Sequence, residues 1–217
     1  EEFSNVRFFT LALHRPWAMS RRWWLLLALS LVAEALGDST VYVIRHGEKT
    51  WTLGCLSPAG EMRARNIPKV FSGQPSEKHA TFSVPKALFA HWYHDFIDCE
   101  RCNQTLTPMS KALDMPIDLS HGGEHPGRGP GGGNAGAAVG ILRTLAATGG
   151  PVLVAWEHIN IQFLTAFLGV AKSKIPNWPD SDYDSVYVLQ YDEQQHLVSF
   201  EHEYQNFTAP VSEELLV

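Results

Sequence analysis

Two short segments of this chain are apolar without alternation, and this feature restricts the possible folds most. They are residues 40–44 (TVYVI) and residues 151–156 (PVLVAW). A strand with one face in water alternates apolar and polar side chains, whereas a strand covered on both faces is apolar throughout. The two segments therefore predict parallel strands in the interior of a sheet that helices cover on both faces.

Helical and strand patterns alternate along the rest of the chain. Ser57 and Pro58 are typical of an N-cap followed by proline at the first helical position. Helices are predicted from that point and at residues 103–113, 137–147 and 159–168, and further strands at residues 85–90, 116–119, 186–191 and 197–204. The last two strands are expected to form an antiparallel edge. The predicted fold class is therefore α/β, with a mostly parallel central sheet and helices on both faces.

Composition excludes some classes of protein. The 217 residues suffice for one ordinary domain, and 45% hydrophobic with 18% charged residues is typical of a globular chain. The net charge is −6 and lysine and arginine form no cluster, which excludes nucleic acid as a partner. A small phosphorylated substrate remains compatible, because a local basic pocket can outweigh a weak overall charge. The pattern does not indicate an oligomeric state.

The N-terminal region resembles a secretory signal peptide. Met19 is followed by Arg21 and Arg22, an apolar run at residues 23–33 and small-x-small sites at residues 33–37. Residues 1–18 are expected to be upstream sequence, residues 19–37 the signal peptide and residues 38–217 the mature domain, secreted or lumenal. The apolar run is shorter than the roughly 20 residues that span a bilayer, so no stable membrane span is expected in the mature chain. A buried helix or an uncleaved anchor is the alternative.

The cysteines and most histidines do not form a metal-binding pattern. Cys99 and Cys102 have the spacing of a redox motif, but no second pair accompanies them, which excludes a four-thiolate zinc site. A bridge from Cys55 to Cys99 or Cys102 and three free thiols both remain open. Several imidazoles and carboxylates lack a consistent ligand spacing, so no metal is predicted; these are His91, His94, Asp95, Asp98, His121 and His125.

Histidines follow both interior strands directly. Arg45 and His46 follow the first strand, and Glu157 and His158 follow the second. In open α/β sheets, ligands bind beyond the carboxyl ends of the strands. An arginine fork can bind two phosphate oxygens, and a neutral imidazole beside it can attack phosphorus. These positions predict a phosphoryl-transfer site.

Four motifs in chain order carry a family resemblance. They are Arg45-His46-Gly47-Glu48 after the first strand; residues 56–60 (LSPAG) with Arg63 and Ala64; residues 101–106 (RCNQTL) with Pro108; and residues 152–158 (VLVAWEH) with Leu168 and Gly169. Together they resemble the histidine phosphatase superfamily, which has the phosphoglycerate mutase-like fold. The matches span most of residues 40–170.

The resemblance implies a mechanism and a set of site residues. His46 accepts the phosphoryl group, and Arg45, Arg101 and His158 bind the phosphate. Water then hydrolyses the phosphohistidine, so the chain is expected to be a phosphomonoester hydrolase that needs no metal or organic cofactor.

The leaving oxygen needs a proton donor. Glu124 lies in the loop where one branch of the family keeps its acid, and we prefer it to Glu157. The rival interpretation is a non-catalytic module that binds phosphate ligands in the same pocket. A phosphomutase is a further alternative, but no second basic cluster is present for a second phosphate.

Overall fold

The sheet has six strands in the order β3-β2-β4-β1-β5-β6. The pairs β3–β2, β2–β4 and β4–β1 are parallel. Strand β5 pairs antiparallel with both β1 and β6. Their bounds are β1 Thr40–Arg45, β2 Ala87–Ala90, β3 Ile117–Asp118, β4 Val152–Trp156, β5 Ser185–Tyr191 and β6 Leu197–Tyr204. The predicted α/β class with an antiparallel edge is confirmed.

This computed structural model describes residues 39–50, 54–93, 99–123 and 130–208. Contacts divide the chain into Glu1–Leu36 and Gly37–Val217, and the sheet and its helices belong to the second unit. The predicted upstream segment and the predicted signal peptide at residues 19–37 lie outside the described residues. In the described part of the chain, no helix combines the length and apolar character needed to span a membrane.

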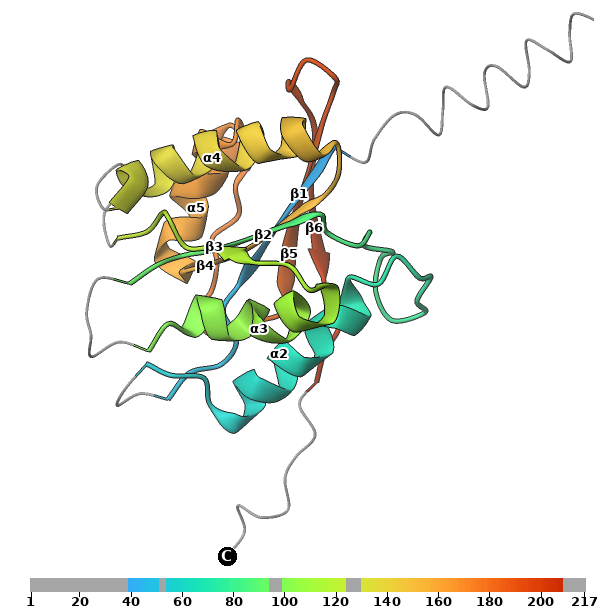
Figure 1. Cartoon of the computed structure of the whole chain (residues 1–217), viewed down its shortest axis with the longest axis vertical. Coiled ribbons are helices and arrows are strands. Elements are labelled where there is room, and N and C mark those ends of the chain that lie inside the picture. Colours follow the sequence, from blue (N-terminus) through green and yellow to red (C-terminus); the bar gives the residue numbers. More distant parts are fainter. Residues whose placement is uncertain (1–38, 51–53, 94–98, 124–129, 209–217) are drawn as a thin grey trace, which may run out of the picture. The chain divides into compact units, whose positions relative to one another are not determined.

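Helices cover both faces of the sheet (Figure 1). Helices α2 (Pro58–Val70) and α3 (Arg101–Leu113) pack on one face, and α4 (Gly133–Thr148) and α5 (His158–Phe167) pack on the other. Two short 3₁₀ helices, η1 (Pro130–Gly132) and η2 (Lys172–Lys174), complete the elements of the described residues.

Strand β1 shows why alternation is absent from the interior strands. Val41 and Val43 lie in the core with α4 and α5, while Tyr42 and Ile44 lie in the core with α2 and α3. All of β1 is buried, because each face meets a layer of helices.

Two helices begin two or more residues earlier than the sequence pattern predicted. Helix α3 begins at Arg101 rather than at residue 103, and α4 begins at Gly133 rather than at residue 137. The second difference places the first turn of α4 in the glycine-rich stretch before the predicted helix. Glycine disfavours a helix by about 1 kcal/mol relative to alanine, so the glycine-rich stretch did not indicate one. In the folded chain Asn134 is buried in the first turn and contributes tertiary hydrogen bonds that outweigh this preference.

A disulfide joins the segments that precede α2 and α3. Cys55 and Cys99 are bonded, with Cα atoms 4.7 Å apart, and Cys102 is a buried free thiol. This settles the pairing that the sequence left open.

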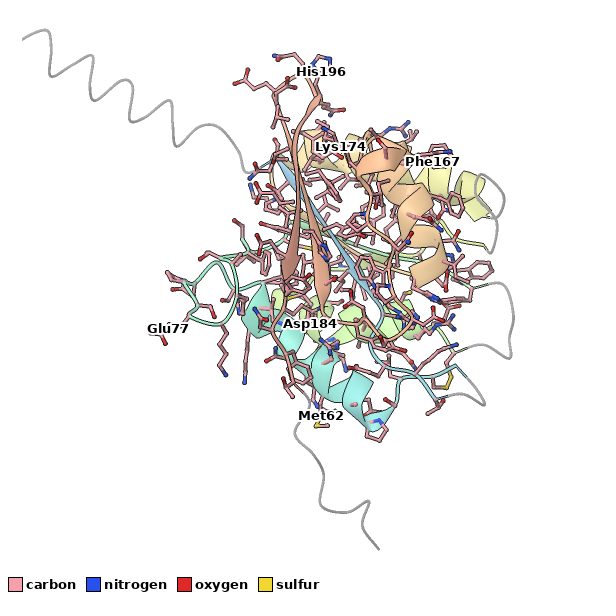
Figure 2. The ribbon with its side chains drawn as sticks, turned by 180° about the vertical axis from the view of Figure 1, so that it is seen from behind. Met62, Glu77, Phe167, Lys174, Asp184 and His196 are labelled. Atoms are coloured by element: carbon pink, nitrogen blue, oxygen red, sulfur yellow. A yellow bond between two sulfur atoms is a disulfide. The ribbon has the colours of Figure 1, made fainter. Side chains whose placement is uncertain are left out.

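The β5–β6 hairpin lies at one edge of the sheet, and its turn and its open end lie at opposite ends of the strands. Figure 2 shows His196 at its turn and Asp184, directly before β5, at the opposite end beside α2. Because β5 is antiparallel to β1, the start of β5 lies at the carboxyl end of β1. The loop that precedes β5 therefore reaches the edge where Arg45 and His46 lie.

Candidate active site

The carboxyl ends of β1 and β4 lie side by side. Arg45 is the register partner of Trp156, and the His46 amide donates to the Trp156 carbonyl over 3.2 Å. Glu157 and His158 continue directly from β4 into α5. The positions predicted from the two strand ends therefore come together at one edge.

His46 is fully buried and its imidazole orientation is set by one hydrogen bond. Nδ1 donates to the Gly47 carbonyl over 2.7 Å, which leaves the lone pair on Nε2, and Nε2 has no hydrogen-bond partner among the described residues. Burial, with the charges of Arg101 and Arg45, lowers the pKa of His46 to about 3. The ring is therefore neutral at neutral pH, as a nitrogen nucleophile must be.

Arg45 braces a loop as well as contributing charge. One terminal nitrogen donates to the carbonyl oxygens of Asp180 at 2.7 Å and Asp182 at 3.0 Å, and to that of Pro179 at 3.3 Å. The guanidinium carbon lies 4.0 Å from the centre of the Tyr183 ring. Its Nε is buried and finds no hydrogen-bond partner within the described part of the chain. Arg45 therefore fixes the loop before β5 while one donor remains uncommitted.

Arg101 reaches the same region from the start of α3. Its guanidinium carbon lies 4.1 Å from the centre of the Tyr93 ring, and its Nε is also buried with no partner among the residues that the structure describes. The Thr105 hydroxyl donates to the Arg101 carbonyl at 2.8 Å and accepts the Gly47 amide at 2.9 Å. This threonine ties the first turn of α3 to the turn that holds His46.

Buried nitrogens without described partners gather on the predicted phosphate-binding residues. Three of these nitrogens are Nε of Arg45, Nε2 of His46 and Nε of Arg101. An unsatisfied buried donor costs about 1–3 kcal/mol, so such a cluster is rare unless a ligand satisfies it. Two guanidinium donors around one imidazole lone pair suit a tetrahedral anion whose central atom the imidazole can attack.

His158 lies between two carboxylates. Its Nδ1 is 2.9 Å from Glu157 Oε1, at ion-pair distance but outside hydrogen-bond alignment, and its Nε2 is 2.9 Å from Asp180 Oδ1. Asp180 had no sequence signal, because it comes from the irregular segment before β5. The contact to Asp180 places the loop carboxylate where an anionic ligand of His158 would bind.

Glu157 is the N-cap of α5. Its Oε2 accepts both the amide and the side-chain nitrogen of Asn160, each at 3.2 Å. Burial raises the pKa of Glu157, but His158 and the Asn160 hydrogen bonds outweigh burial and lower it to about 2. A carboxyl group with this pKa has no proton to donate at neutral pH. Glu124, the preferred donor, lies outside the described residues.

The side chains of two buried asparagines, Asn134 and Asn160, connect Trp156 to Glu157 by hydrogen bonds. The Trp156 indole donates to Asn134 at 2.8 Å, and Asn134 donates to the Asn160 side chain at 2.6 Å. Sequence reasoning missed both asparagines, because Asn134 lies in the glycine-rich stretch and neither residue belongs to a recognised motif.

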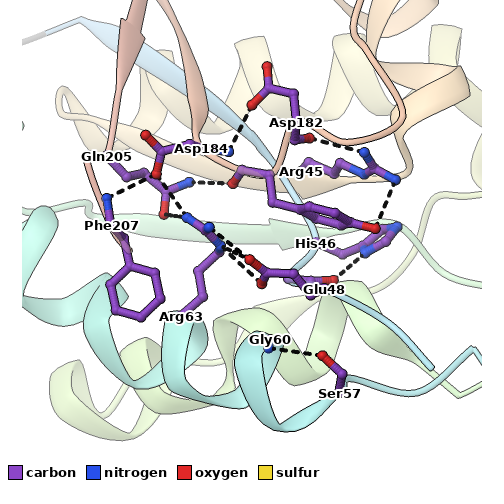
Figure 3. A network of polar contacts seen from close by, with 12 residues as sticks. Arg45, His46, Glu48, Ser57, Gly60, Arg63, Asp182, Asp184, Gln205 and Phe207 are labelled. Atoms are coloured by element: carbon purple, nitrogen blue, oxygen red, sulfur yellow. Dashed lines mark hydrogen bonds and ion pairs between the residues drawn. The ribbon is translucent and has the colours of Figure 1, made fainter. Parts of the chain in front are cut away.

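The other motif residues hold the site together (Figure 3). Arg63 donates through two nitrogens to Glu48, at 2.8 to 3.1 Å, and also to Asp184 at 3.0 Å. A Cβ atom on Gly60 would lie 2.2 Å from the Glu48 carbonyl, so the turn after β1 and the start of α2 require glycine for close approach. These residues link the turn, α2 and the start of β5.

A third histidine follows a neighbouring parallel strand. His91 comes directly after β2, its amide donates to Ala155 at 3.0 Å, and its ring packs 4.8 Å from the Trp156 ring. The same strand-end signal that indicated His46 and His158 would have found it. Of the other residues weighed as metal ligands, His94, Asp95, Asp98 and His125 lie outside the described residues.

Comparison with known proteins rests on structure alone. No family model and no curated protein sequence matches this chain. The protein histidine phosphatase SixA, solved in complex with tungstate, is 16% identical with a TM-score of 0.50, over 77% of this chain and 97% of that chain. A mutant phosphoserine phosphatase from Entamoeba histolytica, in complex with phosphoserine, is 13% identical with a TM-score of 0.46, over 74% of this chain and 95% of that chain. The match to SixA confirms the predicted phosphoglycerate mutase-like fold.

Proposed function

We propose that this chain, whose fold is that of the histidine phosphatase superfamily, hydrolyses a phosphomonoester through a phosphohistidine on His46. One observation carries the proposal. A buried imidazole at a strand end has an unengaged Nε2, and its pKa is lowered by burial and by the charges of two arginines that each keep an uncommitted buried Nε donor. The solved SixA structure holds tungstate, a tetrahedral oxyanion, which is the chemistry that such a cluster suits.

The proposed reaction has two steps. His46 Nε2 attacks phosphorus, the bond from phosphorus to the leaving oxygen breaks, and Arg45, Arg101 and His158 hold the phosphoryl oxygens. Water then attacks the phosphohistidine, the bond between nitrogen and phosphorus breaks, and inorganic phosphate leaves. Throughout, Nδ1 of His46 keeps its proton and donates a hydrogen bond to the Gly47 carbonyl, which orients the ring for both steps.

The test compares wild type with His46→Ala on a nitrophenyl phosphate. We expect the variant to lose turnover, and wild type quenched in alkali during turnover to carry phosphate on His46. Wild-type turnover in His46→Ala would refute the proposal. His91→Ala is the matched control, because His91 also follows a parallel strand but has no proposed role in the chemistry.

A non-catalytic phosphate-binding module is the rival function. Its support is that Glu157 is ionised and that its carboxylate oxygens are engaged by His158 and Asn160, so it supplies no proton for the leaving group. Vanadate binding by a protein that turns over no phosphomonoester would favour the module.

We propose that the chain enters the secretory pathway and is secreted or lumenal. The support is the signal-like pattern at residues 19–37 together with the Cys55–Cys99 disulfide, since disulfides persist in oxidising compartments. Expression of the full chain in a secreting eukaryotic cell, followed by N-terminal sequencing, tests this. Recovery of uncleaved protein in the cytosol would contradict it.

A further inference from the structure

The proposed first step leaves a negative charge on the departing oxygen, which requires a proton donor. Acidic residues that contact Arg45, Arg63 or His158 in the described part of the chain are Glu48, Glu157, Asp180, Asp182 and Asp184. They differ in the contacts that already engage their oxygens.

Structural contacts hold most of these carboxylates. Glu48 and Asp184 are ion-paired with Arg63. Asp182 accepts the amides of Asp184 and Ser185 at 2.9 and 3.1 Å, and also the Ser185 hydroxyl. Glu157 caps α5 and accepts the Asn160 side chain. Each of these groups is thus engaged in contacts that support the fold.

Asp180 differs in its setting. Its side chain is 93% exposed, and its carboxylate contacts Nε2 of His158, a residue proposed to bind the phosphate. Its own carbonyl accepts from Arg45 at 2.7 Å. The main chain is thus held at the phosphate-binding residues, while the carboxyl group can rotate about its two side-chain torsions.

We propose that Asp180 is the general acid that protonates the leaving oxygen. This inference rests on the proposed phosphatase function. It assigns a role on the loop before β5, instead of Glu124 or Glu157.

The direction of the reaction supports the assignment. Nucleophile and leaving oxygen lie roughly in line on opposite sides of phosphorus. His46 is fully buried, so the leaving oxygen points away from the interior and toward solvent. Asp180 is the exposed carboxyl group on the solvent side, in contact with a phosphate-binding residue.

Substrate binding also releases the Asp180 carboxylate from its contact with His158. A ring nitrogen of His158 forms one hydrogen bond, so a phosphate oxygen that binds Nε2 displaces the Asp180 carboxylate. The displaced carboxylate stays beside the anionic phosphate, since Arg45 holds its main chain.

The proton balance closes over both steps. In the first step the Asp180 carboxyl gives its proton to the leaving oxygen as the bond from His46 Nε2 to phosphorus forms. In the second step the Asp180 carboxylate takes a proton from water as the water oxygen attacks phosphorus and the bond to His46 breaks. The acid is then protonated again for the next cycle.

The test uses Asp180→Asn with two substrates that differ in leaving group. A nitrophenyl phosphate leaves as a stable anion and needs little protonation, whereas an alkyl phosphate depends on it. Loss of a general acid typically costs 10²–10⁴-fold, so we expect kcat for the alkyl phosphate to fall by about 10²–10³-fold. We expect kcat for the nitrophenyl phosphate to fall by less than about tenfold. A residue with a purely structural role would slow both substrates alike.

Glu157→Gln and Glu124→Gln are the matched controls, and both are expected to change the two rates in equal proportion. The proposal is overturned if Asp180→Asn slows both substrates equally, or if the leaving-group dependence appears in Glu124→Gln instead. Tighter binding of inorganic phosphate by Asp180→Asn without leaving-group dependence would also overturn it, since Asp180 would then only compete with the ligand. Loss of turnover in His46→Ala is judged separately, so failure of this inference and failure of the phosphatase proposal are distinguishable.

Discussion

Two regions of this molecule bury arginine in opposite ways. Arg63 extends from α2 toward the start of β5, and its charge is paired with Glu48 and Asp184. Arg45 and Arg101 lie at the sheet edge, and each keeps a buried Nε without a hydrogen-bond partner in the described structure. All three arginines are less than 10% exposed, so burial does not distinguish the two regions. The difference lies in partners: an arginine paired with carboxylates holds elements together, whereas one with an uncommitted donor can bind an anion.

The largest expected effect on stability comes from removing Arg63 from the first region. Arg63→Met leaves Glu48 and Asp184 without their counter-charge, and loss of one partner from a buried pair costs about 3 kcal/mol. We expect the unfolding free energy, measured by urea denaturation, to fall by about that amount. Arg65→Met is the control, because its pair with Glu61 is exposed and should change stability by less than about 0.5 kcal/mol. Equal losses of unfolding free energy in the two variants would contradict a structural role for Arg63.

The next prediction removes Arg101 from the second region, the sheet edge, and separates an effect on catalysis from an effect on stability. Arg101→Ala removes a donor proposed to act on the phosphoryl oxygens, and loss of such a donor costs roughly 10²–10³ in kcat. Its contact to the Tyr93 ring contributes only about 1 kcal/mol, so the urea midpoint should move little. A variant that keeps its kcat and loses stability would place Arg101 in the same class as Arg63.

The smallest effect is a dependence of stability on pH. The pKa of His46 is about 3 in the folded chain against 6.5 in the unfolded chain, so below pH 6.5 the unfolded state binds a proton that the folded state does not. Stability then falls with decreasing pH by at most about 1.4 kcal/mol per unit.

His46→Gln should lose less unfolding free energy than wild type between pH 7 and pH 5. The depressed pKa of Glu157 acts elsewhere, because its stabilisation is present above pH 4.5 and is lost as pH falls toward about 2. Identical pH profiles for wild type and His46→Gln would contradict a buried, neutral His46.

Much of the fold could be predicted because it depends on local patterns. Strands β1 and β4 are apolar throughout since both faces meet helices, and the Ser57 cap begins α2 where the pattern placed it. The glycine-rich start of α4 could not be predicted, because the hydrogen bonds that join Asn134 to Trp156 and Asn160 exist only after folding.

The candidate site divides in the same way. The sequence by itself determined which residues end the strands, and with them the placement of Arg45, His46 and His158 at one edge, because parallel strands direct their carboxyl ends to the same side. Only the tertiary structure decided which donors stay uncommitted, that Glu157 is held ionised, and that Asp180 contacts His158. Those properties depend on burial and on contacts between residues distant in the chain, which no local pattern encodes.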